Sequence, residues 1–341
     1  MKATAGNTVY TVYIVSGTTK YNVTPVLVAL DRKEADGQIA QCVKLQLMNV
    51  LVEGTWLSSL LKARDRVVVY ADDGSQEGEV FRGYLWTRTY NSSSSKRELK
   101  FTCYDNLIYL QESEESLYFS SGKNTKDVFA SICEKWGVKL EYSYESITHE
   151  KLPLRGKLYD IFTADILDLV KKRTKKKYVI RSEQDTLAVR TVGQNSTVYQ
   201  FNAGENVVET ASGWTMDGII TQVVIVGKAD KDDREPIEAT VSGKTSEYGT
   251  LQKIQSRDEN TTLKDAKLEA QNTIDENGVP KWEYELTGPD IPWIRKGDMV
   301  YVNSGDIYKR YLIVTEVDRA ADNKRSDMTL TMEDIKERSS Q

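Results

Sequence analysis

The side chains that most often carry out acid–base, nucleophilic or zinc chemistry are scarce in this chain. His149 is the single histidine, and the three cysteines, Cys42, Cys103 and Cys133, form no Cys-x-x-Cys pair. Zinc sites, Ser-His-Asp triads and Cys-His pairs all use histidine. We therefore expect His149 to lie in a polar loop without a catalytic role. The cysteines are expected to be reduced thiols buried in cores.

Acidic residues cluster twice, but neither cluster has the spacing of a known site. Glu112, Glu114 and Glu115 are neighbours in one acidic connector, so they cannot straddle a glycosidic bond as paired catalytic carboxylates do. Residues 230–235 are rich in acidic side chains, but Arg234 stands where an EF-hand calcium loop has glycine. We expect that segment to be a solvated acidic loop.

Two basic motifs have the composition of anion sites. Residues 121–125 read Ser-Gly-Lys-Asn-Thr, but Leu117 stands where a phosphate-binding loop has its first glycine, so a turn and a helix cap are expected. Six of the seven residues 171–177 are Lys or Arg. Cations at a helix C-terminus favour the helix dipole, which predicts a solvated helix end. A phosphate or nucleic-acid contact and an acidic protein partner stay open as alternatives.

We accordingly predict no catalytic, cofactor-binding or metal-binding residues, no cofactor and no enzymatic activity. The formal net charge of −5 argues against a dedicated nucleic-acid binder, because such domains are usually basic. The chain has 19 Tyr against 6 Phe. Tyrosine suits strands and half-buried protein interfaces, where an apolar ring meets a wet edge. The composition therefore favours a component of an assembly.

The elements that would position these residues begin with a region of strands. Alternating apolar side chains and turn residues predict strands at residues 9–15, 43–48, 66–71, 79–90 and 96–104. Short strands at close spacing without intervening helices are typical of an antiparallel barrel or sandwich. We assign this first β domain to residues 1–111.

A change of composition marks the next domain, at residues 112–196. A helix capped by Thr125 and ending near Trp136 is expected, followed by a second helix over residues 163–173. A strand pair over residues 178–191 completes a small α+β domain.

Strands return in the last part of the chain, which we assign to a second β domain at residues 197–341. They are predicted at residues 219–226, 282–286, 299–302, 311–317 and 328–332. A helical pattern over residues 262–276 begins near a threonine cap and ends at an Asn-Gly pair. This pattern predicts a helix-containing insert at about residues 242–280.

The two β domains contain a weak internal repeat. Asp65 and the strand after it parallel Asp298 and its strand, Tyr84-Leu85 parallels Tyr311-Leu312, and Phe101-Thr102-Cys103 parallels Leu330-Thr331-Met332. Each aspartate is expected to accept backbone N–H bonds in the turn that enters its strand. We interpret the matching order as a duplication, with chance similarity of β-rich segments as the alternative.

The order of domains resembles the baseplate hub proteins of contractile phage tails and phage-tail-like particles, above all the XkdQ/YqbQ-type late proteins of Gram-positive prophages. The likeness lies in residues 65–69, 81–83, 99–105, 238–241, 248–252 and 296–300. It covers about residues 5–335. The first repeat departs from the Gly-Asp pattern of the second, because Arg64 precedes Asp65.

The resemblance implies a mainly β chain of the α+β class, in which two tube-like antiparallel β-barrel domains flank the small α+β domain. It implies a structural hub that forms a homotrimeric, pseudo-sixfold ring. The ring would join the hexameric tail tube to the threefold spike (the cell-puncturing protein) and nucleate tube assembly. Baseplate wedge and tape-measure proteins are further expected partners. The expected location is the baseplate of a virion or R-type bacteriocin (tailocin), assembled in the host bacterial cytoplasm.

Two other functions stay open from the residues alone. A tail-associated protein that binds or hydrolyses peptidoglycan would need two carboxylates about 5–10 Å apart in a cleft. A nucleic-acid contact would use residues 171–177. No apolar run approaches the roughly 18 residues of a membrane span, and residues 1–7 lack the apolar segment of a signal peptide, so no membrane partner is expected.

Overall fold

The computed structural model describes residues 8–335 apart from 95, 144, 230–233, 258–260 and 323. Asp230, Asp232 and Asp233 of the acidic loop thus lie outside the described residues. The chain divides into two compact units. The first unit contains residues up to Ala211 and from Tyr284 onward, and the second is Ser212–Glu283.

The first part of the first unit is built from strands, as predicted. Its elements are β1 (Val9–Ser16), β2 (Thr19–Asn22), a 3-10 turn (Thr24–Val26), β3 (Leu27–Glu34), β4 (Cys42–Met48), β5 (Leu51–Val52), β6 (Thr55–Trp56), α1 (Leu57–Leu60), β7 (Arg66–Asp72), β8 (Glu77–Ser92) and β9 (Arg97–Asp105). Alternate side chains of these strands, such as Val12 and Ile14 of β1 and Val67 and Val69 of β7, are fully buried. The period of two that predicted the strands therefore also defines the core face.

The α+β part follows a short helix, α2 (Ile108–Gln111). Its elements are β10 (Glu114–Phe119), α3 (Thr125–Lys135), β11 (Lys139–Tyr142), β12 (Leu152–Lys157), α4 (Leu158–Asp160), a π-helical segment (Ile161–Leu167), α5 (Asp168–Thr174), β13 (Tyr178–Glu183) and β14 (Thr186–Thr191). β10 pairs with β12, and β11, β14 and β13 form a second small sheet. The β13–β14 hairpin turns at Gln184 and Asp185, which both have positive φ.

Three local predictions in this part were wrong. The cap of α3 is Asn124, whose side chain accepts the N–H of Asp127 at 2.9 Å, one residue before the predicted Thr125. The second helix begins at Leu158 and passes through the π-helical segment, so Thr163 lies inside it and donates to the Tyr159 carbonyl at 2.8 Å. The acidic connector is largely the strand β10, because residues 114–119 pair antiparallel with residues 152–157 of β12.

The last part of the chain adds six more strands, of which β16 and β20 cross the boundary between the two units. They are β15 (Tyr199–Asn202), β16 (Glu209–Thr215), β20 (Lys281–Pro289), β21 (Met299–Ser304), β22 (Ile307–Asp322) and β23 (Ser326–Asp334). Between β16 and β20 the chain forms the second unit, with β17 (Gln222–Val226), β18 (Ile237–Ser242), α6 (Thr245–Tyr248), β19 (Gln252–Ser256) and α7 (Leu263–Asn277). Thr262 caps α7 as predicted, accepting the N–H of Asp265 at 3.1 Å. Ala266, Ala270 and Ile274 of α7 pack on Val223 and Ile225 of β17.

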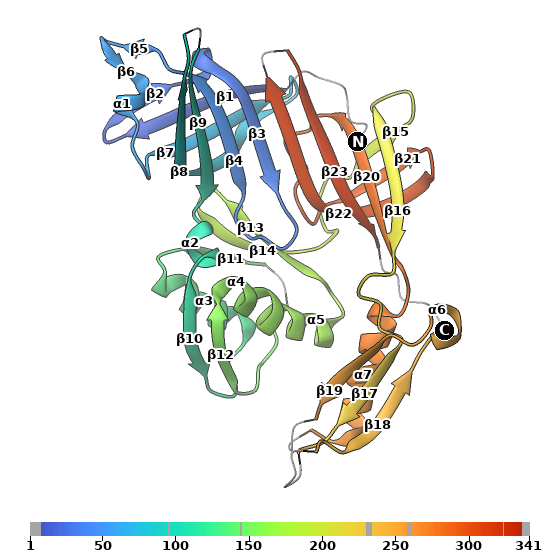
Figure 1. Ribbon diagram of the computed structural model, residues 1–341. Helices are drawn as coiled ribbons and strands as arrows, with labels where there is room; N and C mark the ends of the chain where they lie inside the picture. Colours follow the sequence, from blue (N-terminus) through green and yellow to red (C-terminus); the bar gives the residue numbers. More distant parts are fainter. Residues whose placement is uncertain are drawn as a thin grey trace. The chain divides into compact units, whose positions relative to one another are not determined.

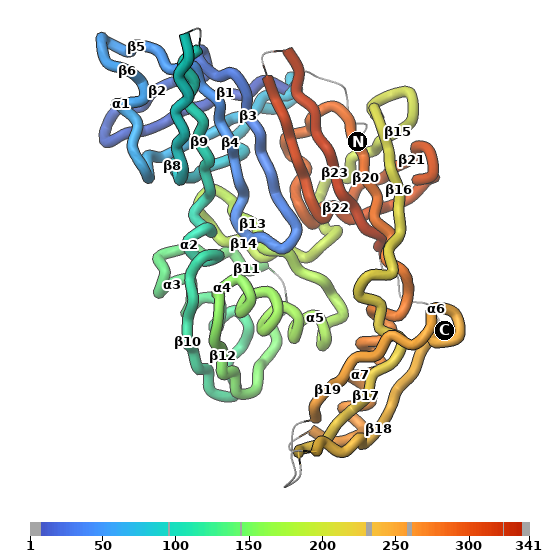
Figure 2. Tube along the Cα trace, in the orientation of Figure 1, coloured from blue at the N-terminus to red at the C-terminus, as the bar shows by residue number. Residues whose placement is uncertain are grey.

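The mainly β character is confirmed, and no closed barrel is found among the strands that the structure describes. All the large strands belong to one 13-stranded sheet, whose main path runs β16-β20-β23-β22-β3-β4-β9-β8-β7-β1-β2. Among the residues that the structure describes, this path is open at both ends. The two β regions join because β22 is long: Met299–Ser304 pair with its first half, and residues 29–34 of β3 pair with residues 317–322. Figures 1 and 2 show the blue strand β3 beside the red strand β22.

No helix among the described residues is long and apolar enough to cross a membrane.

Candidate functional site: a polar junction between the two repeats

The internal repeat is present in the strand register. Leu85 of β8 pairs with Cys103 of β9, and Val314 of β22 pairs with Met332 of β23. A bulge follows directly in both copies, after which Thr87 pairs with Thr102 and Glu316 with Thr331. A bulge is a specific feature of a strand pair, so its recurrence at one place in both copies supports duplication.

The aspartate turns that enter the two repeats are also alike. The Asp65 carboxylate accepts the N–H of Lys62 at 2.7 Å, and the Asp298 carboxylate accepts the N–H of Arg295 at 2.9 Å, three residues back in each case. The carbonyl of Asp65 then accepts the N–H of Leu85, and that of Asp298 the N–H of Val314. The predicted match of Tyr84-Leu85 with Tyr311-Leu312 was therefore two residues out of register, while the match of Phe101-Thr102-Cys103 is confirmed.

The second of these turns belongs to a segment that contacts both repeats and the α+β part. We call residues 290–298, which link β20 to β21, the junction loop. Asp290, Ile291, Ile294 and Asp298 are buried although the segment has no regular structure. A buried loop must satisfy its polar groups with partners from elsewhere in the chain, and this loop does so with side chains and carbonyls from several strands.

At the start of the junction loop, Asp290 gathers donors from three strands. It accepts Nε of Arg319 (β22) at 2.9 Å and Oγ of Ser326 (β23) at 2.8 Å. The hydroxyl of Tyr10 (β1) donates to the same carboxylate, and burial raises the pKa of that tyrosine above its usual range. Asp290 and Arg319 are 2% and 0% exposed, so this ion pair is fully desolvated.

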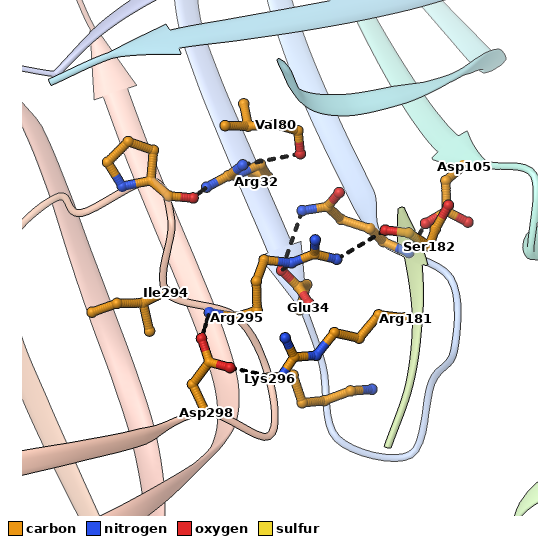
Figure 3. Close-up of polar contacts among 12 residues, drawn as sticks. Arg32, Glu34, Val80, Asp105, Arg181, Ser182, Ile294, Arg295, Lys296 and Asp298 are labelled. Carbon is orange, nitrogen blue, oxygen red and sulfur yellow. Dashed lines mark hydrogen bonds and ion pairs between the residues drawn. The ribbon is translucent and has the colours of Figure 1, made fainter. Parts of the chain in front are cut away.

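A second arginine lies beside the first. Arg32 of β3 is the direct cross-strand partner of Arg319 and is also 0% exposed. Its guanidinium donates to the carbonyls of Pro292 at 2.6 Å and Val80 at 3.1 Å. Burial, together with the like charge of Arg319, lowers the pKa of Arg32 to about 10. The junction loop therefore supplies one backbone carbonyl to Arg32, where it supplies the Asp290 carboxylate to Arg319 (Figure 3).

The middle of the junction loop bridges the first repeat and the α+β part. Arg295 Nε donates to Glu34 Oε1 at 2.5 Å, and its Nη2 donates to the carbonyl of Ser182 at 3.1 Å (Figure 3). The next residue, Lys296, donates to the carbonyl of Ala35 at 2.9 Å. Burial on its own would raise the pKa of Glu34, but the charge and hydrogen bond of Arg295 outweigh it and bring that pKa to about 2.

The end of the junction loop holds the hairpin of the α+β part. Arg181 Nη2 of β13 donates to Asp298 at 2.7 Å. Gly297 has φ +87°, and a Cβ there would lie 2.6 Å from Cγ1 of Val179 in β13. A glycine is required here both by the left-handed backbone and by the close approach of β13.

Trp293 connects the same loop to the β7–β8 turn. Its Nε1 donates to Asp73 at 2.6 Å, and a Cβ at Gly78 would lie 3.2 Å from its ring. Burial opposes ionisation of Asp73, but its hydrogen bonds from Ser75, Gln76 and Trp293 lower its pKa to about 2. A polar cavity of about 860 Å³ lies beside these residues, lined by Asp73, Asp290 and Asp298 among others. Each of these carboxylates already accepts hydrogen bonds from the chain, so they serve the junction.

The ion pair between Glu34 and Arg295 predicts a loss of stability in acid. A carboxyl whose pKa is depressed on folding contributes stability above its unfolded pKa of about 4.3, and loses it as the pH falls toward the folded value. At pH 6 we expect Glu34→Gln to be less stable than the natural chain by about 3 kcal/mol, because Arg295 keeps a buried charge without its partner. Urea denaturation from pH 6 to pH 2.5 should show this difference shrinking below pH 4.5. A difference that stays constant with pH would contradict the assignment.

The residues singled out from the sequence serve structural purposes. His149 lies in a loop, as predicted, but its side chain is 2% exposed and its Nε2 lies 2.8 Å from the Thr125 hydroxyl. Burial, with the charge of Arg173, lowers its pKa. Cys103 and Cys133 are free thiols buried in cores, as predicted, whereas Cys42 is a free thiol that is only half-buried. The Glu115 carboxylate pairs with Lys135, which connects β10 to the end of α3 within the α+β part.

The basic run ends α5, with Lys175 in the left-handed conformation at the C-cap. Arg173 donates to the carbonyl of Thr148 at 2.6 Å, and Lys172 and Lys177 pair with Asp168 and Glu333. The motif at residues 121–125 is the turn and cap of α3. Within the described ranges, no group of three or more His, Cys, Asp or Glu side chains is placed to hold a metal ion.

The junction loop was not predicted from the sequence. The side chains that pair with those of Asp290, Arg295 and Asp298 lie 29 to 280 residues away along the chain, so no local pattern marks these pairs. The one available indication was the Gly-Asp pair at residues 297–298, which the repeat had singled out.

Known structures share this fold over nearly the whole chain. A 43 kDa tail protein of prophage MuSo2 from Shewanella oneidensis is 13% identical, with a TM-score of 0.71 over 96% of this chain and 98% of that one. A tail protein from Neisseria meningitidis is 14% identical, with a TM-score of 0.68 over 95% and 96%. An Escherichia coli component of the type VI secretion system, described as similar to the T4 tail proteins gp27 and gp5, is 10% identical, with a TM-score of 0.56 over 92% and 74%. At these identities the likeness establishes the fold.

Sequence comparison points the same way. No match was found among curated protein sequences. The model of the YQBQ-like family matches residues 50–333, which include both copies of the repeat, the α+β part and the second unit. The resemblance noted in the sequence is thereby confirmed, and the chain belongs to the YQBQ-like family.

Proposed function

We propose that this chain is the structural hub of the baseplate in a contractile injection system, either a phage tail or an R-type bacteriocin. In this role it forms a trimeric, pseudo-sixfold ring that joins the hexameric tail tube to the threefold spike and nucleates tube assembly. The tube-like domains are residues 1–111 and 197–341, with the insert at about residues 242–280 in the second, and residues 112–196 are the α+β domain.

The observation that carries this proposal is the repeat within one sheet. Both copies have the same aspartate turn, strand register and bulge. We call each copy of the repeat, with its strands, a module. Three chains contain six similar modules, which could match a sixfold tube, while the trimer as a whole has the threefold symmetry of the spike. A single protein can adapt one symmetry to the other in this way.

The junction loop supports the same role. The ion pair of Arg295 with Glu34 connects this loop to β3 of the first module. The loop is also paired with β22 of its own module through Asp290 and with β13 of the α+β part through Asp298. Buried, hydrogen-bonded charges specify one arrangement of the parts they connect, at some cost in stability. An adaptor needs its modules at one fixed spacing to match a tube.

The proposed partners follow from the fold family. Solved relatives include prophage tail proteins and Francisella PdpA–VgrG complexes. We infer contacts with tail tube protein, the spike, baseplate wedge and tape-measure proteins, in a particle assembled in the bacterial cytoplasm. The chain acts in this proposal without catalysis and without a cofactor.

The test is the mass of the purified chain and of its mixture with the tail tube protein of the same particle. Light scattering after size exclusion should show a species of three times 38.7 kDa, and electron microscopy should show a ring with a lumen. Addition of this trimer should shorten the lag before tube protein polymerises. A chain that stays monomeric with the tube protein, and leaves the lag unchanged, contradicts the proposal.

A further inference from the structure

Within the chain, the two modules are joined by the pairing of β22 with β3, and the same pairing can be applied to two copies of the chain. Residues 317–322 of β22 extend beyond the bulge and have β23 on one side and residues 29–34 of β3 on the other. The pairing is antiparallel, with Ala320 opposite Asp31 and Ala321 opposite Leu30. The end of β22 in the second module is therefore hydrogen-bonded to β3 of the first module.

The first module presents the equivalent strand end without a cover. By the shared register, residues 88–92 of β8 correspond to residues 317–321 of β22, because Asn91 faces Glu98 as Ala320 faces Asp327. β7 pairs with β8 only as far as Tyr84. Within the part of the chain that the structure describes, residues 86–92 of β8 therefore pair with β9 alone.

This free edge has the properties of an interface. Every side chain of residues 86–92 is exposed, including Trp86 at 40% and Tyr90 at 45%. Beside it lies a groove of about 590 Å³, lined by Trp86, Arg88 and Leu61 and bounded by Ser58 and Lys62 near α1. The segment has no proline, and its one charged residue, Arg88, donates to the carbonyl of Ser58 at 2.7 Å. It therefore has little of the charge and proline that commonly protect an edge strand from pairing.

The strand that corresponds to β3 is β16, because β16, β20 and β23 are neighbours in the second module as β3, β4 and β9 are in the first. In the first module, Gln46 of β4 pairs with Ala29 of β3 and with Lys100 of β9, and Lys100 corresponds to Thr329 of β23. In the second module the Thr287 and Thr329 hydroxyls lie 3.1 Å apart, and the carbonyl of Thr287 accepts the N–H of Val208 at 2.9 Å. Val208 therefore takes the position of Ala29.

Glu209, Thr210 and Ala211 consequently correspond to Leu30, Asp31 and Arg32. β16 is hydrogen-bonded to β20 and is the terminal strand of the path among the described residues. Val208, next to it, is 73% exposed.

We propose that β8 of one copy pairs antiparallel with β16 of a second copy of this chain, in the register of β22 with β3. Tyr90, Asn91 and Ser92 then lie opposite Ala211, Thr210 and Glu209 of the second copy. The contact is heterologous, and in the proposed trimer three such contacts close a ring in which intrachain and interchain strand pairs alternate. Backbone hydrogen bonds supply the contact, and Trp86, Tyr90 and Val208 lose their exposure to water. The inference rests on the proposed trimer and names its interface.

A cysteine pair across this strand pair tests the proposal. Directly opposite residues of antiparallel strands have Cα atoms about 4.5–5.5 Å apart, which a disulfide can span. Asn91→Cys with Thr210→Cys places both thiols on one face, and both positions lie away from the buried cores. Under mild oxidation the double variant should give covalent dimers and trimers on a non-reducing gel. A reductant should convert these species back to single chains.

The matched control moves one thiol by one residue. Ser92→Cys with Thr210→Cys points the two side chains to opposite faces of the sheet, so it should yield at least tenfold less cross-linked trimer. The natural chain, with its three cysteines, gives the background.

The outcomes separate the inference from the proposed function. If the chain is a trimer by light scattering but Asn91→Cys with Thr210→Cys gives no more cross-link than the control, the strand pairing is wrong. The proposed hub function is then unaffected. A cross-link between copies in a chain that forms open filaments supports the pairing and contradicts the ring. A chain that is monomeric at all concentrations and forms no cross-link, with or without tube protein, overturns both.

Discussion

Replacing Asp290 by asparagine is expected to lower the free energy of unfolding of the first unit by about 3–5 kcal/mol. Asp290 is the carboxylate that faces Arg319, and both are almost completely buried. Without it the guanidinium keeps a buried charge, and the Tyr10 and Ser326 hydroxyls lose an ionised acceptor. Urea denaturation followed by tryptophan fluorescence gives the comparison with the natural chain.

The matched control for Asp290→Asn is Asp327→Asn, which breaks an exposed ion pair with Arg325 at 3.3 Å. Exposed pairs contribute about 0–1 kcal/mol, so this variant should be close to the natural chain. A second control, Asp290→Leu combined with Arg319→Met, removes both charges and should recover part of the loss. If Asp290→Asn proves as stable as Asp327→Asn, the buried ion pair does not hold the junction.

Replacing Gly83 by alanine is expected to lower the free energy of unfolding by about 3 kcal/mol, because the strand pair at the core of the first module has no room for a methyl group. A Cβ at Gly83 would lie 2.2 Å from the carbonyl oxygen of Tyr104 and 2.5 Å from Cζ of Phe81. The clash involves the backbone of β9, so β8 and β9 would have to separate. Thermal unfolding and urea denaturation both measure the effect.

Gly213 is the matched control for Gly83. It also lies in a strand, β16, but a Cβ there meets nothing within 4 Å. Gly213→Ala should change stability by less than about 1 kcal/mol. Equal effects of the two substitutions would mean that the β8–β9 pair adapts to the added methyl group. The corresponding position of the second module is Leu312, opposite Asp334 as Gly83 is opposite Asp105, so this constraint belongs to the first module only.

The sequence by itself determined most of the elements. Strands such as β1, β7 and β9 follow from a period of two that is written in neighbouring residues. The helix α7 follows from its threonine cap and its apolar stripe. The repeat was also detectable, because the aspartate turn and the Phe-Thr-Cys strand are short local patterns that recur in order.

Local patterns failed where a distant partner decided the structure. The acidic residues of β10 have the composition of a connector, and they are a strand because β12, some forty residues later, supplies the hydrogen bonds. His149 lies in a polar stretch, and it is buried because the start of α3 packs over it. In each case the tertiary environment outweighs local propensity.

Only the tertiary structure decided how the two modules are joined. The pairing of β3 with β22 and the ion pair of Glu34 with Arg295 connect residues more than 250 positions apart, and nothing in the neighbourhood of either residue specifies its partner. The junction forms, first, because β22 extends beyond the end of its partner β21 and can pair with β3. It is also stabilised because the charged side chains of residues 290–298 are buried or half-buried and are paired there with opposite charges or backbone carbonyls. Both effects depend on where the folded chain excludes water, and sequence periodicity carries no information about that.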